Sequence, residues 1–253
     1  MARLRAAGCV WAEEEAVLLQ EAALSARELD DLAARRVAGE PLELVLGWVE
    51  FLGRRLVVAP GVFVPRRRTE LLARTARDLA AHGDRAVVVE MCCGVGPVAA
   101  VLEGAAEVHA ADLSAVALEC ARLNAPGAAL HLGDLYDALP AALAGRVDVL
   151  AANAPYVPTG RIASMPAEAR DHEPRMALDG GGEGVDLHRR LAAGAPAWLA
   201  PGGVLLVETS PAQAGLTTAA MEQAGLETEV LVDADVDGCV AVGRLSRAGA
   251  GTA

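Results

Sequence analysis

Four short apolar runs, each ending in or followed by a polar side chain, constrain the fold of this chain more than any other feature. The runs lie at residues 86–90, 107–112, 128–132 and 147–152. The stretches between them are rich in Ala and Leu and suit helices. Strands that alternate with helices predict an α/β fold built on a parallel sheet.

The polar side chains at the ends of these runs are three acids and one amide. They are Glu90, Asp112, Asp134 and Asn153. In an open α/β sheet, ligands bind at the edge where the carboxyl ends of the parallel strands meet. We therefore expect these four side chains to lie together at a binding site.

The segment after the first run predicts a ligand-binding loop. Met91-Cys92-Cys93-Gly94-Val95-Gly96-Pro97 leads into an Ala-rich stretch, in the order strand, glycine loop, helix. The glycines allow a ligand to approach the backbone, Pro97 suits a first helical turn, and a helix N-terminus offers free N–H groups. The loop lacks both the G-x-G-x-x-G spacing of dinucleotide folds and the Lys of a phosphate-binding loop. An acid at the position of Asp112 can accept both hydroxyls of a ribose.

Asn153-Ala154-Pro155-Tyr156 follows the fourth run and is suited to hold a planar NH2 group. The Asn153 side-chain oxygen and the next backbone carbonyl can accept its two hydrogens, while the Tyr156 ring packs against its face. The chain has only two Asn and two Tyr, and this tetrapeptide contains one of each. A turn that merely leaves a strand would use the same residue types, so the motif alone leaves both interpretations open.

Several segments together resemble the protein-(glutamine-N5) methyltransferases, and especially the release-factor methyltransferases. Residues 63–70 resemble the Pro-Arg-Pro-Glu-Thr-Glu segment of that family, and residues 90–96 its cofactor loop. Residues 153–156 resemble its Asn-Pro-Pro-Tyr substrate motif, and residues 171–175 and 177–181 its following loop. The resemblance covers roughly residues 40 to 245. Asn-Pro-Pro-Tyr is shared with DNA amino-methyltransferases, whereas the Pro-Arg and His-Glu-Pro-Arg segments are more specific.

This resemblance implies a class I, Rossmann-like methyltransferase fold with a seven-stranded, mostly parallel sheet, and S-adenosyl-L-methionine as cofactor. The implied catalytic residues are Asn153, Ala154, Pro155 and Tyr156. Substrate contacts are expected from Asn153, Tyr156, Arg66 and His172. The expected cofactor-binding residues are Glu90, Cys92, Cys93, Gly94, Val95, Gly96, Asp112, Leu113, Asp134, Leu135 and Asn153.

The chain departs from the family pattern at both motifs. Cys92 stands at the first loop Gly, Cys93 at the usual Thr or Ser, and Ala154 at the first Pro of Asn-Pro-Pro-Tyr; Arg67 and Arg68 replace Pro and Glu. Ala154 still supplies a backbone carbonyl but lacks the fixed φ of proline. The pattern fits a variant branch with an unassigned substrate. A small-molecule N-, O- or C-methyltransferase and a non-catalytic cofactor-binding homologue remain alternatives.

Composition bears on partners and location. The net charge is −12, which disfavours a nucleic-acid substrate because duplex binding needs a basic surface. All 22 basic residues are Arg, which we interpret as the codon bias of a GC-rich bacterial genome. The five Cys show no Cys-x-x-Cys spacing, so we expect no metal site. No run of 18 apolar residues and no secretory pattern occurs, so we expect a cytoplasmic enzyme without membrane contact. The expected partner is a release factor, another protein with an exposed amide side chain, or a small molecule.

The remaining pattern predicts four parts. Residues 1–40 form a short helical region with one helix over 12–38, and residues 41–65 a linker with a β-hairpin over 48–58. Residues 66–245 form the methyltransferase domain, and residues 246–253 a tail. Within the domain we expect a helix over 68–81, a turn at 201–203 before a strand over 204–208, and final strands at 226–232 and 238–242. The loop 157–184 is expected to be a lid, with Gly180-Gly181-Gly182 as a flexible hinge.

Overall fold

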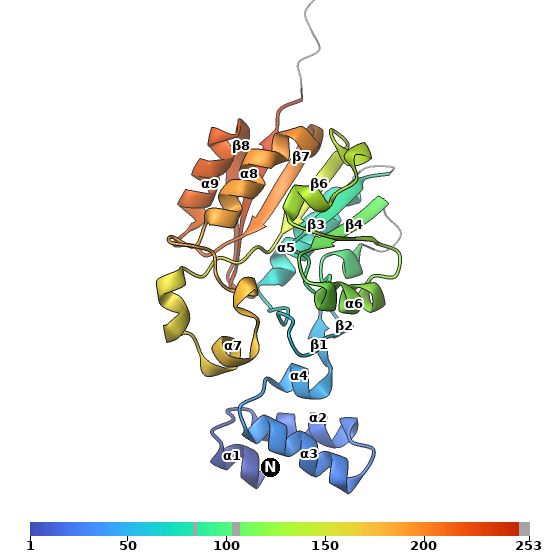
Figure 1. Ribbon diagram of the computed structural model, residues 1–253, viewed down its shortest axis with the longest axis vertical. Helices are drawn as coiled ribbons and strands as arrows, with labels where there is room; N and C mark the ends of the chain where they lie inside the picture. Colours follow the sequence, from blue (N-terminus) through green and yellow to red (C-terminus); the bar gives the residue numbers. More distant parts are fainter. Residues whose placement is uncertain (83–84, 103–106, 248–253) are drawn as a thin grey trace, which may run out of the picture.

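The structure, a computed structural model, describes residues 1–82, 85–102 and 107–247. Its centre is a seven-stranded sheet with the strand order β5-β4-β3-β6-β7-β9-β8 (Figure 1). The strands are β3 (Val87–Met91), β4 (Glu107–Asp112), β5 (Ala129–Leu132), β6 (Val147–Ala152), β7 (Leu199–Glu208), β8 (Leu226–Asp233) and β9 (Gly238–Leu245). The first five are parallel, and β9 runs antiparallel to both β7 and β8. The predicted mostly parallel, seven-stranded sheet is therefore confirmed.

Both faces of the sheet are buried, which explains why its central strands are mostly apolar rather than alternating. All five residues of β3 are buried, and neighbours Val88 and Val89 belong to the hydrophobic cores on opposite faces. One core includes α5 (Thr69–Ala80) and part of α6 (Ala115–Asn124). The other includes α8 (Asp186–Trp198) and α9 (Ala214–Gln223), which lie together over one face (Figure 1).

The N-terminal helices are more divided than the sequence predicts. They are α1 (Ala2–Ala6), α2 (Ala12–Ala22), α3 (Ala26–Val37) and α4 (Leu42–Leu46), at the opposite end of the molecule from β8 (Figure 1). The single helix expected over 12–38 is wrong, because the chain becomes extended at Ala23 and the side chains of Ser25 and Glu28 cap the start of a second helix. The Ser25 hydroxyl accepts from the Glu28 N–H at 3.1 Å, and the Glu28 carboxylate accepts from the Leu24 N–H at 2.7 Å.

The expected β-hairpin is present and is held against the sheet domain. It consists of β1 (Trp48–Phe51) and β2 (Arg54–Val57), joined by a two-residue turn in which both residues have positive φ. The Asn124 side chain, at the end of α6, exchanges two hydrogen bonds with the Val57 backbone at 2.7 and 3.0 Å. The same amide donates to the Val95 carbonyl at 2.9 Å, so one side chain connects the hairpin to the glycine loop.

Three further expectations need correction. Residues 201–203 form an irregularity inside β7 rather than a turn before it, because Val147 pairs with Leu199 and Val149 with Val204. The helix expected after the glycine loop is a 3₁₀ turn, Ala99–Val101, within the described residues. The loop 157–184 contains α7 (Ala167–His172) and two 3₁₀ helices, Thr159–Ser164 and Arg175–Ala177.

The helix expected over 68–81 is present as α5. The four-part division of the chain stays a prediction, and most of the expected tail, residues 248–253, lies outside the described residues. Among the described residues, none of the helices has the length and apolar character required to cross a membrane.

Candidate active site

A cavity of about 590 Å³ opens at the carboxyl ends of the parallel strands. All four polar side chains predicted from the strand ends, Glu90, Asp112, Asp134 and Asn153, line it. It is also lined by Cys92, Cys93, Gly94, Val95, Leu113 and Leu135, so every expected cofactor-binding residue except Gly96 lies on its wall. The order of the strands thus gathers residues from a span of more than sixty positions around one cavity.

Glu90 is buried at the end of β3 and caps the 3₁₀ turn that follows the glycine loop. Its two carboxylate oxygens accept from the Val98 N–H at 3.1 Å and from the Ala99 N–H at 2.7 Å. Burial raises the pKa of this carboxyl to about 8, although the two backbone donors oppose the shift. The backbone N–H groups that we expected to be free for a ligand therefore already donate to Glu90.

Asp112 joins the end of β4 to the glycine loop. One carboxylate oxygen accepts from the Gly94 N–H and the other from the Ser114 N–H, both at 2.8 Å. Burial raises the pKa of Asp112, and these backbone hydrogen bonds pull it back. The acid expected to hold a ribose thus also holds the loop that lies beside it.

The glycine loop has an unusual backbone at its first Cys. Cys92 has φ +53°, a left-handed conformation that a residue with a Cβ adopts at a cost. The family that the sequence resembles has a Gly at this position. Burial raises the pKa of the Cys92 thiol to about 12 and that of Cys93 well above its ordinary value. Both thiols are neutral at physiological pH, which agrees with a packing role rather than a nucleophilic one.

Asn153 lies just past β6, and its amide is oriented by a residue outside the motif. Its Nδ2 donates to the Thr69 hydroxyl at 3.3 Å, across 84 positions of sequence. Thr69 is the first residue of α5 and is fully buried. Since the NH2 end of the amide is committed to Thr69, the oxygen is the end left to accept hydrogens in the cavity.

Ala154 is buried against a histidine that the sequence analysis did not single out. His188, on α8, is buried, and its Nδ1 lies 2.9 Å from the Thr217 hydroxyl. The Ala154 backbone raises the pKa of this ring, an effect smaller than that of burial, and the ring's Nε2 has no hydrogen-bond partner among the described residues. Burial lowers the pKa of His188 to about 4, so the ring is neutral at physiological pH.

Tyr156 is held at its hydroxyl and beside its ring. The hydroxyl donates to Glu208, at the end of β7, over 3.4 Å. The ring lies 6.4 Å from the His188 ring, between centroids, at an interplanar angle of 53°. Burial raises the pKa of Tyr156, so its hydroxyl remains protonated and acts as a donor.

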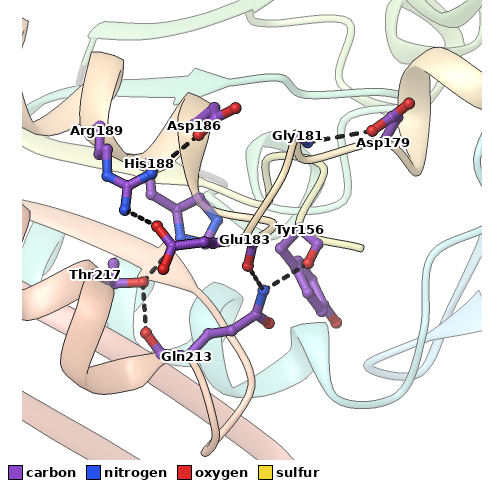
Figure 2. Close-up of polar contacts among 9 residues, drawn as sticks. All are labelled: Tyr156, Asp179, Gly181, Glu183, Asp186, His188, Arg189, Gln213 and Thr217. Atoms are coloured by element: carbon purple, nitrogen blue, oxygen red, sulfur yellow. Dashed lines mark hydrogen bonds and ion pairs between the residues drawn. The ribbon is translucent and has the colours of Figure 1, made fainter. Parts of the chain in front are cut away.

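Gln213 clamps the backbone of the motif to the loop that follows it (Figure 2). Its Nε2 donates to the Tyr156 carbonyl at 2.8 Å and to the Glu183 carbonyl at 3.0 Å. A Cβ at Gly180 would lie 2.7 Å from the Pro155 carbonyl oxygen and from Tyr156 Cα, and one at Gly184 would lie 2.4 Å from the Tyr156 carbonyl oxygen. The expected flexible hinge at 180–182 is therefore wrong at Gly180, where the chain is close-packed against the motif.

The segment after the motif is anchored over the cavity by a buried acid. The Glu173 carboxylate accepts from the Arg66 guanidinium and from the Val64 N–H, the latter at 3.3 Å. At the other side of α7, Glu168 pairs with Arg36 of α3 at 2.5 Å. Arg66 lines the cavity as expected, but its charge is already paired with Glu173.

His172 is not brought into the cavity wall with the other expected substrate contacts. Its side chain is half-buried. Together with Arg35, which has the larger effect, it lowers the pKa of Glu40 in the N-terminal region. Its expected role stays a prediction. Residues that sequence reasoning missed are Thr69, His188, Glu208 and Gln213; Thr69 alone lay within a quoted motif, the segment 63–70.

Curated proteins similar to the chain share one name in most cases. The release factor glutamine methyltransferase of Streptomyces coelicolor is 40% identical over 192 residues, which cover 73% of this chain and 68% of that protein. That of Deinococcus radiodurans is 38% identical over 206 residues, covering 80% and 74%. A third relative, from Streptomyces pristinaespiralis, is named 4-amino-L-phenylalanine/4-methylamino-L-phenylalanine methyltransferase; it is 41% identical over 184 residues, covering 69% and 62%. The chain spans about two thirds of the length of these relatives.

Solved structures agree on the fold. The Mtq2-Trm112 complex of E. cuniculi, described as methylating the eRF1 translation termination factor, has a TM-score of 0.50 at 22% identity, covering 73% of this chain and 99% of that chain. A methyltransferase from Pyrococcus furiosus has a TM-score of 0.55 at 14% identity, covering 86% and 99%. No protein-family model matches the chain. These likenesses identify the class I methyltransferase fold.

Proposed function

The chain belongs to the family of release factor glutamine methyltransferases, and on this premise we propose that it transfers a methyl group from S-adenosylmethionine to the side-chain amide nitrogen of a glutamine in a protein. The observation that carries the proposal is the orientation of Asn153. Its NH2 is bound to Thr69, so its oxygen is left to accept a hydrogen from an amide NH2 in the cavity.

The residues of the cavity suit this cofactor. Its volume falls within the range of ligand pockets, and it has acids at one end and the amide motif at the other. We assign Asp112 to the ribose hydroxyls, the glycine loop and Glu90 to the methionine part, and Asp134 and Leu135 to the border of the adenine. When bound, the cofactor supplies an electrophilic methyl group on its sulfonium.

The chain's own residues supply positioning rather than acid–base chemistry. Asn153 Oδ1 and the Ala154 carbonyl would accept the two hydrogens of the acceptor NH2, which turns the nitrogen lone pair toward the methyl group. The same two oxygens would stabilise the positive charge that develops on that nitrogen. Tyr156 would pack against the plane of the acceptor group. The new N–C bond would form as the S–C bond of the sulfonium breaks and leaves its electron pair on sulfur, and the positively charged nitrogen would then lose one N–H proton to water.

A small-molecule amine is a second candidate, favoured by the relative named for 4-amino-L-phenylalanine. An aromatic amine is conjugated with its ring, so its NH2 is close to planar, like that of an amide. It can donate its two hydrogens to two acceptor oxygens. Ala154, which lacks the ring of proline, also leaves the shape of the pocket different from that of Asn-Pro-Pro-Tyr. The Asn153 and Ala154 acceptors serve both candidates equally well.

Location and partners follow from the same reasoning. A protein substrate would meet the lid formed by residues 157–184 and the N-terminal helices, which Arg36 and Glu168 connect. The net charge of −12 disfavours nucleic acid as substrate. A cytoplasmic location, expected from the sequence, stays a prediction.

The test is product identification with methyl-labelled cofactor. The enzyme is incubated with three acceptors in parallel: a release factor with its glutamine-containing loop, 4-amino-L-phenylalanine, and a bacterial lysate. We expect label on a glutamine side-chain nitrogen of a protein, located by mass spectrometry of the peptide, and at least about a hundredfold slower labelling with Asn153→Ala. Label on the free amino acid or another extractable metabolite, with none on a protein, supports the second candidate. Methylated adenine or cytosine refutes both.

A further inference from the structure

We propose that Glu208 is a positioning residue of the methyl-acceptor site, because it sets through Thr69 which way the Asn153 amide is turned and holds the Tyr156 hydroxyl directly. This inference rests on the proposed function, since it concerns the same acceptor site. It assigns a role to two residues, Thr69 and Glu208, that lie behind the residues in contact with the acceptor.

Glu208 is an ionisable side chain in a fully buried position. It is the last residue of β7, next to β6 in the sheet, and is 1% exposed. Burial of an ionisable group is costly unless partners compensate for the lost water. The Tyr156 hydroxyl donates to Glu208 at 3.4 Å, and the Thr69 hydroxyl lies close enough to oppose the rise that burial causes in the pKa of the carboxyl. Its Oε2 has no hydrogen-bond partner among the described residues.

The direction of each hydrogen bond then follows from the chemistry of the groups. An ionised carboxylate can only accept, whereas a hydroxyl has a single hydrogen to donate. If Thr69 donates that hydrogen to Glu208, its oxygen is left as an acceptor for the Asn153 Nδ2, which lies 3.3 Å away. The amide of Asn153 is therefore turned with its NH2 toward Thr69 and its oxygen toward the acceptor.

Without the carboxylate, this direction is lost. The two ends of an Asn amide have nearly the same shape, so only hydrogen bonds distinguish its two orientations. A Thr69 hydroxyl that no longer donates to Glu208 could donate to Asn153 Oδ1 instead. That arrangement would turn the NH2 of Asn153 toward the acceptor NH2, and two donors would then face each other.

Burial and three neighbouring side chains set the charge of Glu208. Burial raises its pKa to about 7, while Thr69, Arg68 and Tyr156 act in the opposite direction. Cys239 on β9 also faces it, and the carboxylate contributes to raising the pKa of that thiol. The ionised, orienting form of Glu208 therefore gains population as the pH rises through neutrality.

The composition of the chain permits a direct test of the Asn153 orientation. Asn124 and Asn153 are its only asparagines, so ¹⁵N-asparagine labelling gives two side-chain NH2 pairs in a nuclear magnetic resonance spectrum. Asn124 serves as internal control, because its amide is bound to backbone groups of Val57 and Val95. Asn153→Asp identifies the Asn153 pair by removing it.

Two sets of variants decide the proposal. Thr69→Val removes the hydroxyl and should shift the Asn153 pair, whereas the matched Thr69→Ser, which keeps the hydroxyl, should restore it. In the wild type the Asn153 pair should titrate near neutral pH, because burial raises the pKa of Glu208 to about 7. In Glu208→Gln that titration should vanish while the Asn124 pair is unchanged. An Asn153 pair that ignores Thr69→Val, or that titrates alike in Glu208→Gln, overturns the proposal.

Activity provides a second measurement on the same variants. Loss of the orienting hydrogen bonds should lower kcat about tenfold in Thr69→Val and Glu208→Gln, with cofactor affinity changed by less than about twofold. A fall in cofactor affinity with unchanged kcat contradicts a role at the acceptor site. If the wild type transfers no methyl group to glutamine, the proposed function fails, and the spectra still decide the role of Glu208 without any acceptor.

Discussion

The two ends of the cavity are built in different ways. At the cofactor end, Glu90 and Asp112 are held by backbone N–H groups of their own neighbourhood, with four hydrogen bonds between 2.7 and 3.1 Å. At the acceptor end, Asn153 and Tyr156 are held by side chains from α5, β7 and α9, namely Thr69, Glu208 and Gln213. The backbone contacts remain whatever side chains surround them, whereas each contact at the acceptor end depends on one residue type.

This difference suggests how one scaffold can serve different acceptors. The cofactor end depends on loop shape and on two acids, and it can stay constant while acceptors change. The acceptor end can be altered by single substitutions at positions distant in sequence. Relatives named for a protein substrate and for a free amino acid, at similar identity to this chain, are what such a division would produce.

The largest effect that would distinguish the two ends is expected at Asn153. Replacing Asn153 by Ala should lower turnover by about 10² or more, the scale for loss of one preorganised polar group. Cofactor affinity, measured by calorimetry, should change far less, because the cofactor end keeps its backbone contacts. Normal turnover by the variant would mean that the acceptor is held elsewhere.

The opposite pattern is expected at Asp112. Asp112→Ala removes two hydrogen bonds to the backbone and the proposed ribose contact, and should weaken cofactor binding by about tenfold or more. Asp78→Ala is the matched control, since Asp78 is exposed on α5 outside the cavity wall and pairs with Arg77 at the surface. The comparison between the two ends breaks down if Asp112→Ala lowers kcat at saturating cofactor while affinity stays constant.

A smaller effect is expected from Gln213. Gln213→Ala removes the two hydrogen bonds to Tyr156 and Glu183 and a third from the Ser210 hydroxyl, each worth about 1 kcal/mol, which should lower Tm by about 6 °C. Turnover should fall by less than in Asn153→Ala, because the acceptor contacts themselves remain. Gln223→Ala is the control, because Gln213 is the N-cap of α9 and Gln223 is an exposed glutamine at the other end of the same helix. Equal thermal shifts in the two variants would exclude a clamp at Gln213.

The smallest effect concerns pH, and it compares the buried acid of each end. The pKa of Glu90 is raised to about 8 and that of Glu208 to about 7, from 4.5, so between pH 4.5 and 8 the folded chain binds more protons than the unfolded one. The free energy of unfolding should therefore fall as the pH rises. His188, with its pKa lowered from 6.5 to about 4, has the opposite effect below pH 6.5, so the fall should be clearest from pH 6.5 to 8.

Denaturant titrations of the cofactor-free protein across this range measure the slope. Glu90→Gln should flatten it most, and Glu208→Gln should flatten it mainly at the lower end, in keeping with the two pKa values. A slope that neither substitution changes would mean that other groups control this pH dependence.

The sheet could be predicted from sequence because strands covered on both faces are mostly apolar, as at 87–91 and 147–152, where Glu90 and Asp148 are the only polar residues. The strand-end residues could be predicted with it, because parallel topology alone brings Glu90, Asp112 and Asn153 to one edge. The break between α2 and α3 was missed although its capping box is local, because the residues on both sides suit a helix.

The residues that orient the acceptor motif could not be found in the same way. Thr69, Glu208 and Gln213 act on residues 84, 52 and 57 positions away, and the pattern around each is that of an ordinary helix start or strand end. His188 lies in a helix whose apolar face would accommodate many side chains. What gives these residues a role is the packing of α5, α8 and α9 on the sheet, which periodicity alone does not specify.

The close packing of Gly180 and Gly184 against the motif has a consequence for how the acceptor site can change. Neither residue has a functional group, yet any side chain at either position would displace the backbone of Pro155 or Tyr156. In a saturation mutagenesis screen for methyl transfer, these two glycines would tolerate as little as Asn153 itself. Evolution or engineering of a new acceptor is therefore free to vary the side chains of this site, while the path of the backbone around it is inherited unchanged.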